Sequence, residues 1–399
     1  MINFESARLL LYMLDETRLQ TAAKLRDGVL APMKQWFTRK DEIIDLLGLC
    51  LIGGENLFIL GPPGTAKSAL VRELGLRLQG HTFEYLLTRF TEPNELFGPF
   101  DIRKLREGIL ETNTEGMLPE ASLVFLDELL NANSAILNSV LTVLNERVLR
   151  RGREVIDLPL LMVVGASNHL PEEEALQALF DRFLLRVRSD NVPDDELAEV
   201  LAAGWRLAAQ ERDERPAPVT AAQVRELQLA LPEVRLTPAM TAFIETVKRL
   251  RRAGILISDR RAVKLQRLVA ASALMCGRSE AQISDLWVLR YIWDTEEQQE
   301  LLRSVIDEVI DESSKGETSH PRARSQSLPD PELLSSEIDS VTASLGGTEA
   351  DDPERAVARD RLTLIAARCQ WIENSEQRAF VNAKLEAAWL LAGDPGEAA

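Results

Sequence analysis

Cysteine and histidine are scarce in this chain of 399 residues, which has three of each. The cysteines, Cys50, Cys276 and Cys369, are widely separated and follow no CxxC or Cys/His spacing. That pattern supports neither a disulfide framework nor a zinc site, and each cysteine is expected to be a small buried apolar residue. The histidines form no ligand cluster, so histidine-based catalysis is not expected.

Long apolar runs and an excess of positive charge are also absent. No run approaches the length of a membrane-spanning helix, and Met1 to Ser6 lack the basic residues of a secretion signal. A cytoplasmic location is the simplest expectation. The formal net charge of −17 disfavours nucleic acid as a partner. Hydrophobic residues make up 45% of the chain, an ordinary composition for a protein of two or three domains.

Two kinds of periodicity divide the chain. Apolar strands at Asn56–Leu60, Phe83–Leu87, Leu123–Leu126 and Leu160–Ala166 alternate with helical segments, which predicts a parallel sheet covered by helices on both faces. Beyond about Pro193 the apolar residues recur at three- and four-residue spacing, typical of an all-helical lid.

The predicted domains follow from this pattern. A helical segment at 1–30 precedes an α/β core at 31–191 and the helical lid at 192–312. Residues 313–353 are rich in serine, proline, glycine and acidic residues, which predicts a disordered linker. An amphipathic helical segment is predicted at 354–399, with Trp371, Phe380 and Trp389 either anchoring a partner or packing within the segment.

A phosphate-binding loop is predicted between the first strand and the next helix. It comprises Gly61, Pro62, Pro63, Gly64, Thr65, Ala66, Lys67 and Ser68, with Ala69 following in the ATP-binding set. Backbone N–H groups in this pattern surround phosphate oxygens, Lys67 neutralises β/γ charge, and Ser68 can ligate Mg²⁺. Ala66 replaces the usual glycine and fits if its backbone remains right-handed.

A pair of carboxylates ends the strand at Leu123–Leu126. Asp127 is expected near Mg²⁺, and Glu128 is expected to polarise an attacking water. An apolar run that ends in Asp-Glu is common by chance, but here it follows a phosphate loop by one helix-rich segment. The two motifs together predict an ATP site.

Further segments, in the same order, resemble AAA+ proteins of the MoxR group, and within it the regulatory ATPases called RavA. Val163–Asn168 resembles the sensor-1 strand, which implies that Asn168 holds the lytic water. Ala178–Phe183 resembles the segment that supplies an arginine finger to the neighbouring subunit, which implies Arg182 in that role, with Arg186 as the alternative.

The resemblance covers residues 31 to about 300. Ser258–Arg261 resembles the sensor-2 position, where a lid arginine touches the nucleotide; Arg261 is favoured over Arg260. Thr88–Pro99 and Leu286–Trp293 resemble RavA-type members, and Arg103–Gly108 is expected to be an inserted loop that faces a ring pore. A hairpin is expected around Gly152, flanked by Arg147, Arg150, Arg151 and Arg153; the tail does not match.

The resemblance implies a Mg²⁺-dependent ATPase that assembles as a ring, usually a hexamer. It also implies chaperone-like remodelling or activation of a partner protein, with a von Willebrand factor A (vWA) domain protein as co-factor; no residue selects the client. Two alternatives remain open at this point. One is a binding scaffold gated by nucleotide without obligatory turnover, and the other is a DNA motor, which the acidic composition disfavours.

Overall fold

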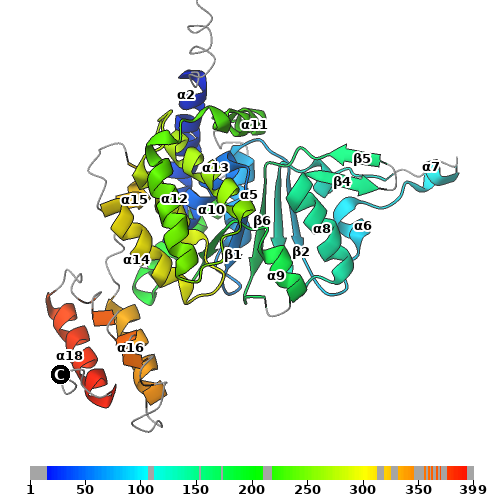
Figure 1. Cartoon of the computed structure of the whole chain (residues 1–399). Coiled ribbons are helices and arrows are strands. Elements are labelled where there is room, and N and C mark those ends of the chain that lie inside the picture. Colours follow the sequence, from blue (N-terminus) through cyan, green and yellow to red (C-terminus); the bar gives the residue numbers. More distant parts are fainter. Residues whose placement is uncertain are drawn as a thin grey trace, which may run out of the picture. The chain divides into compact units, whose positions relative to one another are not determined.

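The computed structural model describes residues 16–106, 112–151, 154–171, 174–209, 218–311, 319–324, 331–345 and 375–392, with scattered residues between 355 and 369. The chain divides into two compact units, Met1–Ala323 and Arg324–Ala399. The first unit contains the sheet and the lid (Figure 1). In the described part of the chain, no helix is both long and apolar enough to cross a membrane.

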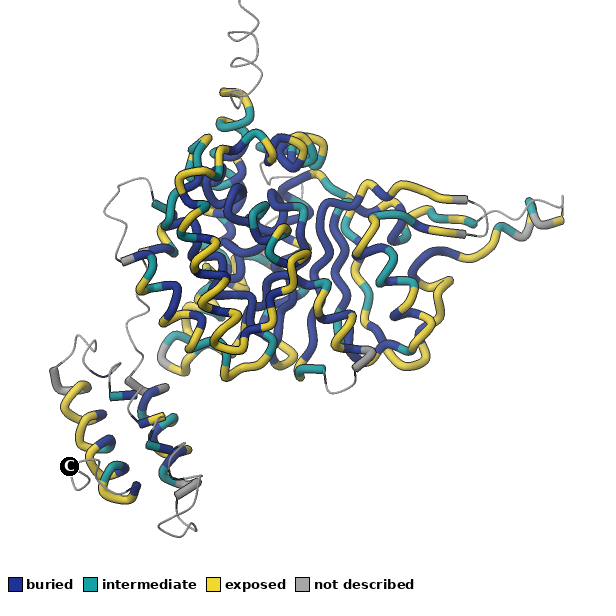
Figure 2. Tube along the Cα trace, in the orientation of Figure 1, coloured by how far each residue is buried: buried dark blue, intermediate teal, exposed yellow. Residues whose placement is uncertain are grey.

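A parallel five-stranded sheet forms the centre of the first unit, in the order β2-β3-β6-β1-β7. The strands are β1 (Leu57–Leu60), β2 (Thr82–Leu86), β3 (Leu123–Asp127), β6 (Met162–Ser167) and β7 (Leu185–Arg188). All residues of β1 and β6 are buried because helices cover the sheet, and the inner strands are dark blue in Figure 2. The predicted sheet is confirmed; β7 was not among the predicted strands.

Helices α4 (Asp41–Gly53) and α5 (Lys67–Arg77) pack against different strands of the sheet. α4 contacts β1 and β7, and α5 contacts β2 and β3. α4 ends at Gly53, and the next residue, Gly54, has a left-handed φ of 67°, which lets the chain turn into β1. Two further helices of this part are α8 (Ser134–Glu146) and α9 (Glu174–Phe180), and the predicted hairpin forms from β4 (Val148–Arg151) and β5 (Glu154–Asp157).

The lid is helical, as predicted. Its elements are α10 (Leu197–Ala209), α11 (Ala221–Ala230), α12 (Thr237–Arg252), α13 (Asp259–Met275), the 3₁₀-helix η7 (Ile283–Tyr291) and α14 (Gln298–Asp311). α13 packs on α4 and joins the lid to the core. The last part of the predicted lid, from residue 282 to 312, forms two separate elements, η7 and α14. Residues of η7 are buried on all sides, so no single apolar face marked its periodicity.

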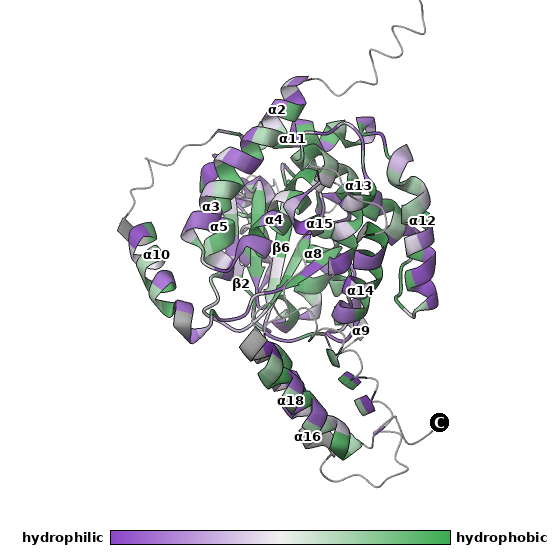
Figure 3. Cartoon of the chain, turned by 90° about the vertical axis from the view of Figure 1, so that its left-hand side faces the viewer, coloured by the Kyte–Doolittle hydropathy of each residue, from purple (hydrophilic) through white to green (hydrophobic). Residues whose placement is uncertain are grey.

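The N-terminal part is helical where it is described. It comprises α2 (Glu16–Lys24), the π-helix η1 (Leu25–Leu30) and α3 (Ala31–Trp36), and α2 packs against α11 and α13. Buried apolar residues of η1 and α3 belong to the same hydrophobic core as the strands. The strands of the sheet are mostly green, the colour of hydrophobic residues, in Figure 3.

The second unit contains α16 (Pro331–Leu345) and α18 (Ser375–Ala392), which pack together. α16 lies inside the stretch 313–353 predicted as a disordered linker, so residues 331–345 are helical, and the bounds of the linker stay a prediction. Leu334, Ile338 and Val341 follow helical spacing and are buried against α18, but the polar composition around them obscured the pattern. Trp389 packs against this cluster, Phe380 is 59% exposed, and Trp371 lies outside the described residues.

Candidate functional site

Three neighbouring strands bring the predicted motifs to one edge of the sheet. β3, β6 and β1 are adjacent and parallel, so their carboxyl ends lie side by side. These ends lead into Asp127–Glu128, Asn168 and Gly61 respectively. The Gly61 N–H donates to the Ser167 carbonyl at 2.9 Å, which joins the start of the phosphate loop to the end of β6.

The phosphate loop has the geometry that its glycines require. A Cβ atom at Gly61 would lie 2.2 Å from the Ser189 carbonyl oxygen, so the position accepts only glycine. Gly64 has a φ of 86° and open space around it. Lys67 is 5% exposed, and its Nζ donates to the carbonyls of Gly61 at 2.6 Å and Pro62 at 3.1 Å. The ammonium group therefore lies over the loop, at the start of α5.

Ala66 departs from the expected backbone conformation. Its φ of 65° and ψ of 19° are left-handed, whereas the sequence argument required a right-handed residue. An L-residue with a side chain pays about 1–2 kcal/mol in this region. The loop thus keeps the conformation that glycine would adopt freely, and it stores strain beside Lys67.

Glu128 is also held in a left-handed conformation, with φ 50° and ψ 41°. Its N–H donates to Asp127 Oδ1 at 3.0 Å, and Asn131 Nδ2 donates to Glu128 Oε2 at 3.3 Å. Strained residues cluster at functional sites, and here the strain turns the acidic pair away from the line of β3. Sequence reasoning missed Asn131, whose signal is an amide three residues after the acidic pair.

Asn133 joins the exit from β3 to the Thr88–Pro99 segment. Its side chain caps α8 by accepting from the Ala135 and Ile136 N–H groups, both at 3.1 Å. The same amide donates to the Thr91 carbonyl at 2.7 Å.

The Thr88–Pro99 segment contains the short helix α6 (Pro93–Phe97) and is followed by α7 (Ile102–Arg106). The rest of the predicted inserted loop, residues 107 and 108, lies outside the described residues.

Lys40 is a second lysine near the phosphate loop, and sequence reasoning missed it because it belongs to no motif. Its Nζ donates to the Asp190 carbonyl at 2.7 Å and to Ser189 Oγ at 3.1 Å, and Ser189 Oγ donates to the Thr65 carbonyl at 3.2 Å. Burial lowers the pKa of Lys40; Asp190 opposes this shift, and the charge of Lys67 adds to it.

Arg182 lies at the amino ends of the strands, opposite the phosphate loop, in the turn between α9 and β7. Its side chain is 27% exposed and pairs with Asp181 at 3.0 Å. A pocket at this edge is lined by Asp181, Arg182, Leu184, Ser258, Arg260, Arg261 and Lys264. The finger segment and the start of the lid helix α13 therefore share one cationic surface.

Arg186, the alternative finger, is fully buried. It donates to the carbonyls of Ile292 at 3.1 Å and Trp293 at 3.0 Å, and it pairs with Asp294 at 2.9 Å. Burial lowers its pKa to about 9, and the neighbouring charge of Arg261 adds to this shift. Of the two arginines, only Arg182 reaches solvent.

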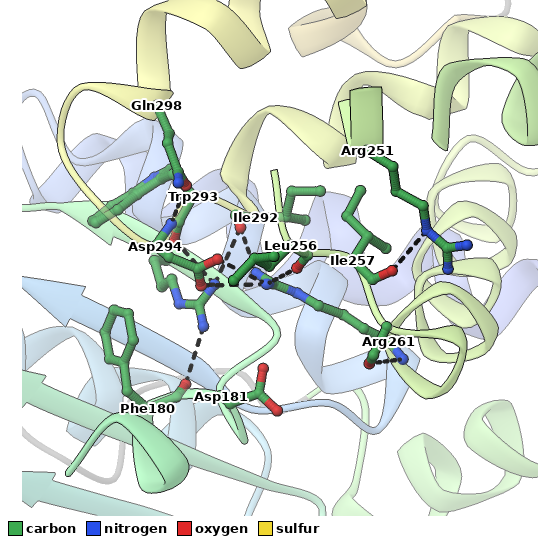
Figure 4. Close-up of polar contacts among 12 residues, drawn as sticks. Phe180, Asp181, Arg251, Leu256, Ile257, Arg261, Ile292, Trp293, Asp294 and Gln298 are labelled. Atoms are coloured by element: carbon green, nitrogen blue, oxygen red, sulfur yellow. Dashed lines mark hydrogen bonds and ion pairs between the residues drawn. The ribbon is translucent and has the colours of Figure 1, made fainter. Parts of the chain in front are cut away.

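Arg261 contacts the same aspartate (Figure 4). Its guanidinium is bound to Asp294 at 3.1 Å, to the Leu256 carbonyl at 3.0 Å and to the Ile292 carbonyl. Arg260 is instead exposed and donates to Asn145 Oδ1 at 3.2 Å. The role predicted for Arg261 stays a prediction, and its side chain is committed to the lid in this structure.

The phosphate loop, at the carboxyl ends of the strands, and Arg182, at their amino ends, are too far apart to meet in one site of the same chain. The backbone runs through β1 from Asn56 to Gly61, which spans roughly 16 Å at about 3.3 Å per residue. Asn56 contacts the Arg182 backbone, and Gly61 begins the phosphate loop. The cationic surface therefore faces away from the phosphate loop of its own chain.

Comparisons with known proteins indicate the family. Residues 23–229 match the model of the MoxR domain in the MoxR-vWA-beta-propeller ternary systems, and residues 239–306 match an AAA lid domain. An uncharacterised protein of Methanocaldococcus jannaschii is 36% identical over 264 residues, which cover 66% of this chain and 68% of that protein. The chaperone MoxR1 of Mycobacterium tuberculosis is 25% identical over 174 residues, 42% of this chain and 45% of MoxR1.

A solved structure shows the same fold. It is a crystal structure of a candidate ATPase from Cytophaga hutchinsonii, with a TM-score of 0.57 and 17% identity, and the match covers 79% of this chain and 99% of that one. The family model spans more than half of the 399 residues and includes the phosphate loop and the acidic pair. The chain belongs to the MoxR family of AAA+ ATPases.

Proposed function

We propose that this chain hydrolyses ATP in a Mg²⁺-dependent reaction and couples turnover to the remodelling or activation of another protein. The observation that supports it is the convergence of the phosphate loop, Asp127–Glu128 and Asn168 at the carboxyl ends of three adjacent strands. The strained backbone at Ala66 and Glu128 adds support, because strain of this kind persists where function needs it.

The residues present fit the nucleotide and its cation. The loop from Pro62 to Gly64 is exposed, Gly64 leaves open space, and Ser68 and Asp127 offer the hydroxyl and carboxylate oxygens that Mg²⁺ accepts. Ser68 and Asp127 would hold Mg²⁺, which neutralises charge on the phosphate oxygens.

The catalytic roles follow from the charges at this edge. Lys67 stabilises the charge of the transferred phosphoryl group. Glu128 takes a proton from the attacking water or polarises it, and Asn168 orients that water. Asn131 holds one oxygen of Glu128 at 3.3 Å, which restricts the direction in which the carboxylate points.

The site is completed by a second copy of the chain. Arg182 lies at the edge opposite its own phosphate loop, so it stabilises the γ-phosphate of a neighbour, and the exposed Arg260 lies on the same surface. A head-to-tail contact of this kind closes into a ring, which we propose to be a hexamer. The lid arginine, Arg260 or Arg261, would then also contact the nucleotide of the neighbouring subunit.

The proposed partner is a vWA domain protein. The matching family model is described by its occurrence with vWA and β-propeller proteins, and the relative MoxR1 is named a chaperone. Assignment to the RavA-like subfamily remains a proposal that rests on Thr88–Pro99 and Leu286–Trp293.

Replacement of Glu128 by Gln tests hydrolysis directly. The variant should bind Mg·ATP like the wild type in calorimetry and lose at least about 100-fold in turnover, because a general base contributes 10²–10⁴-fold. The exposed Glu226, changed to Gln on α11, is a matched control that should keep full turnover. Full activity in Glu128→Gln would refute the assigned base. If the Glu128→Gln ring binds ATP without hydrolysing it and still activates its partner protein fully, the result would favour the binding scaffold that is gated by nucleotide.

A further inference from the structure

We propose that Asn56 is a positioning residue for Arg182, which it holds by the backbone on the surface offered to the neighbouring subunit. This inference rests on the proposed role of Arg182 in a neighbour's site. Asn56 belongs to no recognised motif: it is the residue before β1, at the edge opposite the phosphate loop.

Asn56 is fully buried, and the described contacts use both ends of its side-chain amide. Oδ1 accepts from Arg147 Nη2 at 2.9 Å and from the Val163 N–H at 3.2 Å. Nδ2 donates to the Arg182 carbonyl at 3.2 Å. Because two donors face Oδ1, the amide can only point its Nδ2 toward Arg182, so its orientation is determined by its neighbours.

The turn that contains Arg182 needs such a support. Its N–H donates to the Leu179 carbonyl at 2.9 Å, a bond within the turn itself. Its side chain pairs with the exposed Asp181, and an ion pair of that kind holds a guanidinium only weakly. The Asn56 amide is a side-chain contact that reaches the Arg182 backbone from the sheet. Loss of this bond frees the carbonyl and lets the base of the Arg182 side chain move.

Arg147 connects this contact to the rest of the core. It ends α8 with a φ of 56° and precedes β4, and its Nη2 also donates to the Gly54 carbonyl at 3.2 Å. Burial lowers its pKa to about 10, with Glu55 opposing the shift. The Arg182 backbone is thus tied, through Asn56 and Arg147, to the carboxyl end of α8.

The neighbouring residue Glu55 makes a parallel link to the lid. Its Oε2 accepts from Lys264 on α13 at 2.7 Å, and Glu55 itself is buried. Glu55 and Asn56, which precede β1, therefore contact α13 and the turn that contains Arg182. These two elements form the cationic surface. This arrangement fixes the two elements relative to the same strand.

Asn56→Asp replaces the NH2 group that donates to the Arg182 carbonyl by an oxygen and keeps an acceptor for Arg147 and Val163. We expect the variant to fold and to bind Mg·ATP within about 2-fold of wild type, while its kcat falls about 10- to 100-fold, since a displacement of about 1 Å can cost 10²-fold. Asn138→Asp, the same change at an exposed position of α8, should leave kcat unchanged. Mixing Asn56→Asp with Lys67→Ala should restore part of the activity. In the mixed ring, a Lys67→Ala subunit supplies a correctly held Arg182 to the intact phosphate loop of an Asn56→Asp subunit.

Arg147→Met provides a second route if Asn56→Asp does not fold. It removes one of the two donors to Asn56 Oδ1 and leaves the Val163 N–H. Thermal unfolding is measured beside the kinetics, because the loss of one buried charged group can itself lower stability. A several-fold fall in kcat at unchanged ATP affinity supports the proposal. Full kcat in a folded Asn56→Asp, or a loss that mixing does not repair, overturns it. A fully active Arg182→Ala would instead refute the finger itself.

Discussion

Arg182 and Arg186 are four residues apart, and the structure predicts opposite consequences when each is changed to alanine. Arg182 is 27% exposed and pairs only weakly with Asp181, so its loss should cost at most about 1 kcal/mol of stability. Arg186 is fully buried between Phe180, η7 and Asp294, and breaking such a buried ion pair costs about 3–5 kcal/mol. At about 2–4 °C per kcal/mol, Arg186→Ala should lower the Tm of the first unit by roughly 6–20 °C.

Turnover should separate the same two variants. Arg182→Ala should lose about 10³-fold or more in kcat at saturating ATP, as other arginine fingers do, with nucleotide affinity and Tm close to wild type. The assay is steady-state phosphate release together with calorimetric unfolding and a size measurement in ATP. Unchanged turnover in Arg182→Ala, or a fall in its Tm as large as that of Arg186→Ala, would refute the assignment.

Two further predictions concern strain and protonation. Ala66→Gly should raise the free energy of unfolding by about 0.5–1 kcal/mol, because it relieves a left-handed alanine at some cost in unfolded-chain entropy; denaturant titration checks this, and a destabilised variant would contradict it. His320 stacks on Trp287, with ring centroids 4.5 Å apart, and burial lowers its pKa to about 4. Since the unfolded state then binds the proton more readily, stability should fall by about 2–4 kcal/mol between pH 6.5 and pH 4, and His320→Phe should flatten that part of the pH profile of urea unfolding. An unchanged profile in His320→Phe would show that other groups cause the acid loss.

The sheet and its motifs could be predicted because each is a local pattern. Buried parallel strands read as apolar runs, and the phosphate loop and acidic pair have fixed spacing. The left-handed backbone at Ala66 could not be predicted, because alanine favours right-handed conformations and only the fold imposes the other. The difference between Arg182 and Arg186 depends on Asp294, which is more than a hundred residues away in the chain.

Other features were hidden by composition or by distance. The core-facing residues of α16 are diluted by polar neighbours, and η7 is apolar on all sides, so neither showed a helical face. Asn56, Lys40 and Asn131 act through contacts that no motif encodes. Asn56 bonds to a carbonyl 126 positions away, a separation at which spacing in the sequence carries no information.

The central claim is that one chain supplies the phosphate loop and another supplies Arg182. Lys67→Ala and Arg182→Ala should each be inactive alone. When equal amounts are mixed before ATP is added, random neighbours pair an intact loop with an intact arginine at about one quarter of the interfaces, so the mixture should regain about one quarter of the wild-type rate. A mixture that assembles and remains inactive would contradict a site shared between subunits.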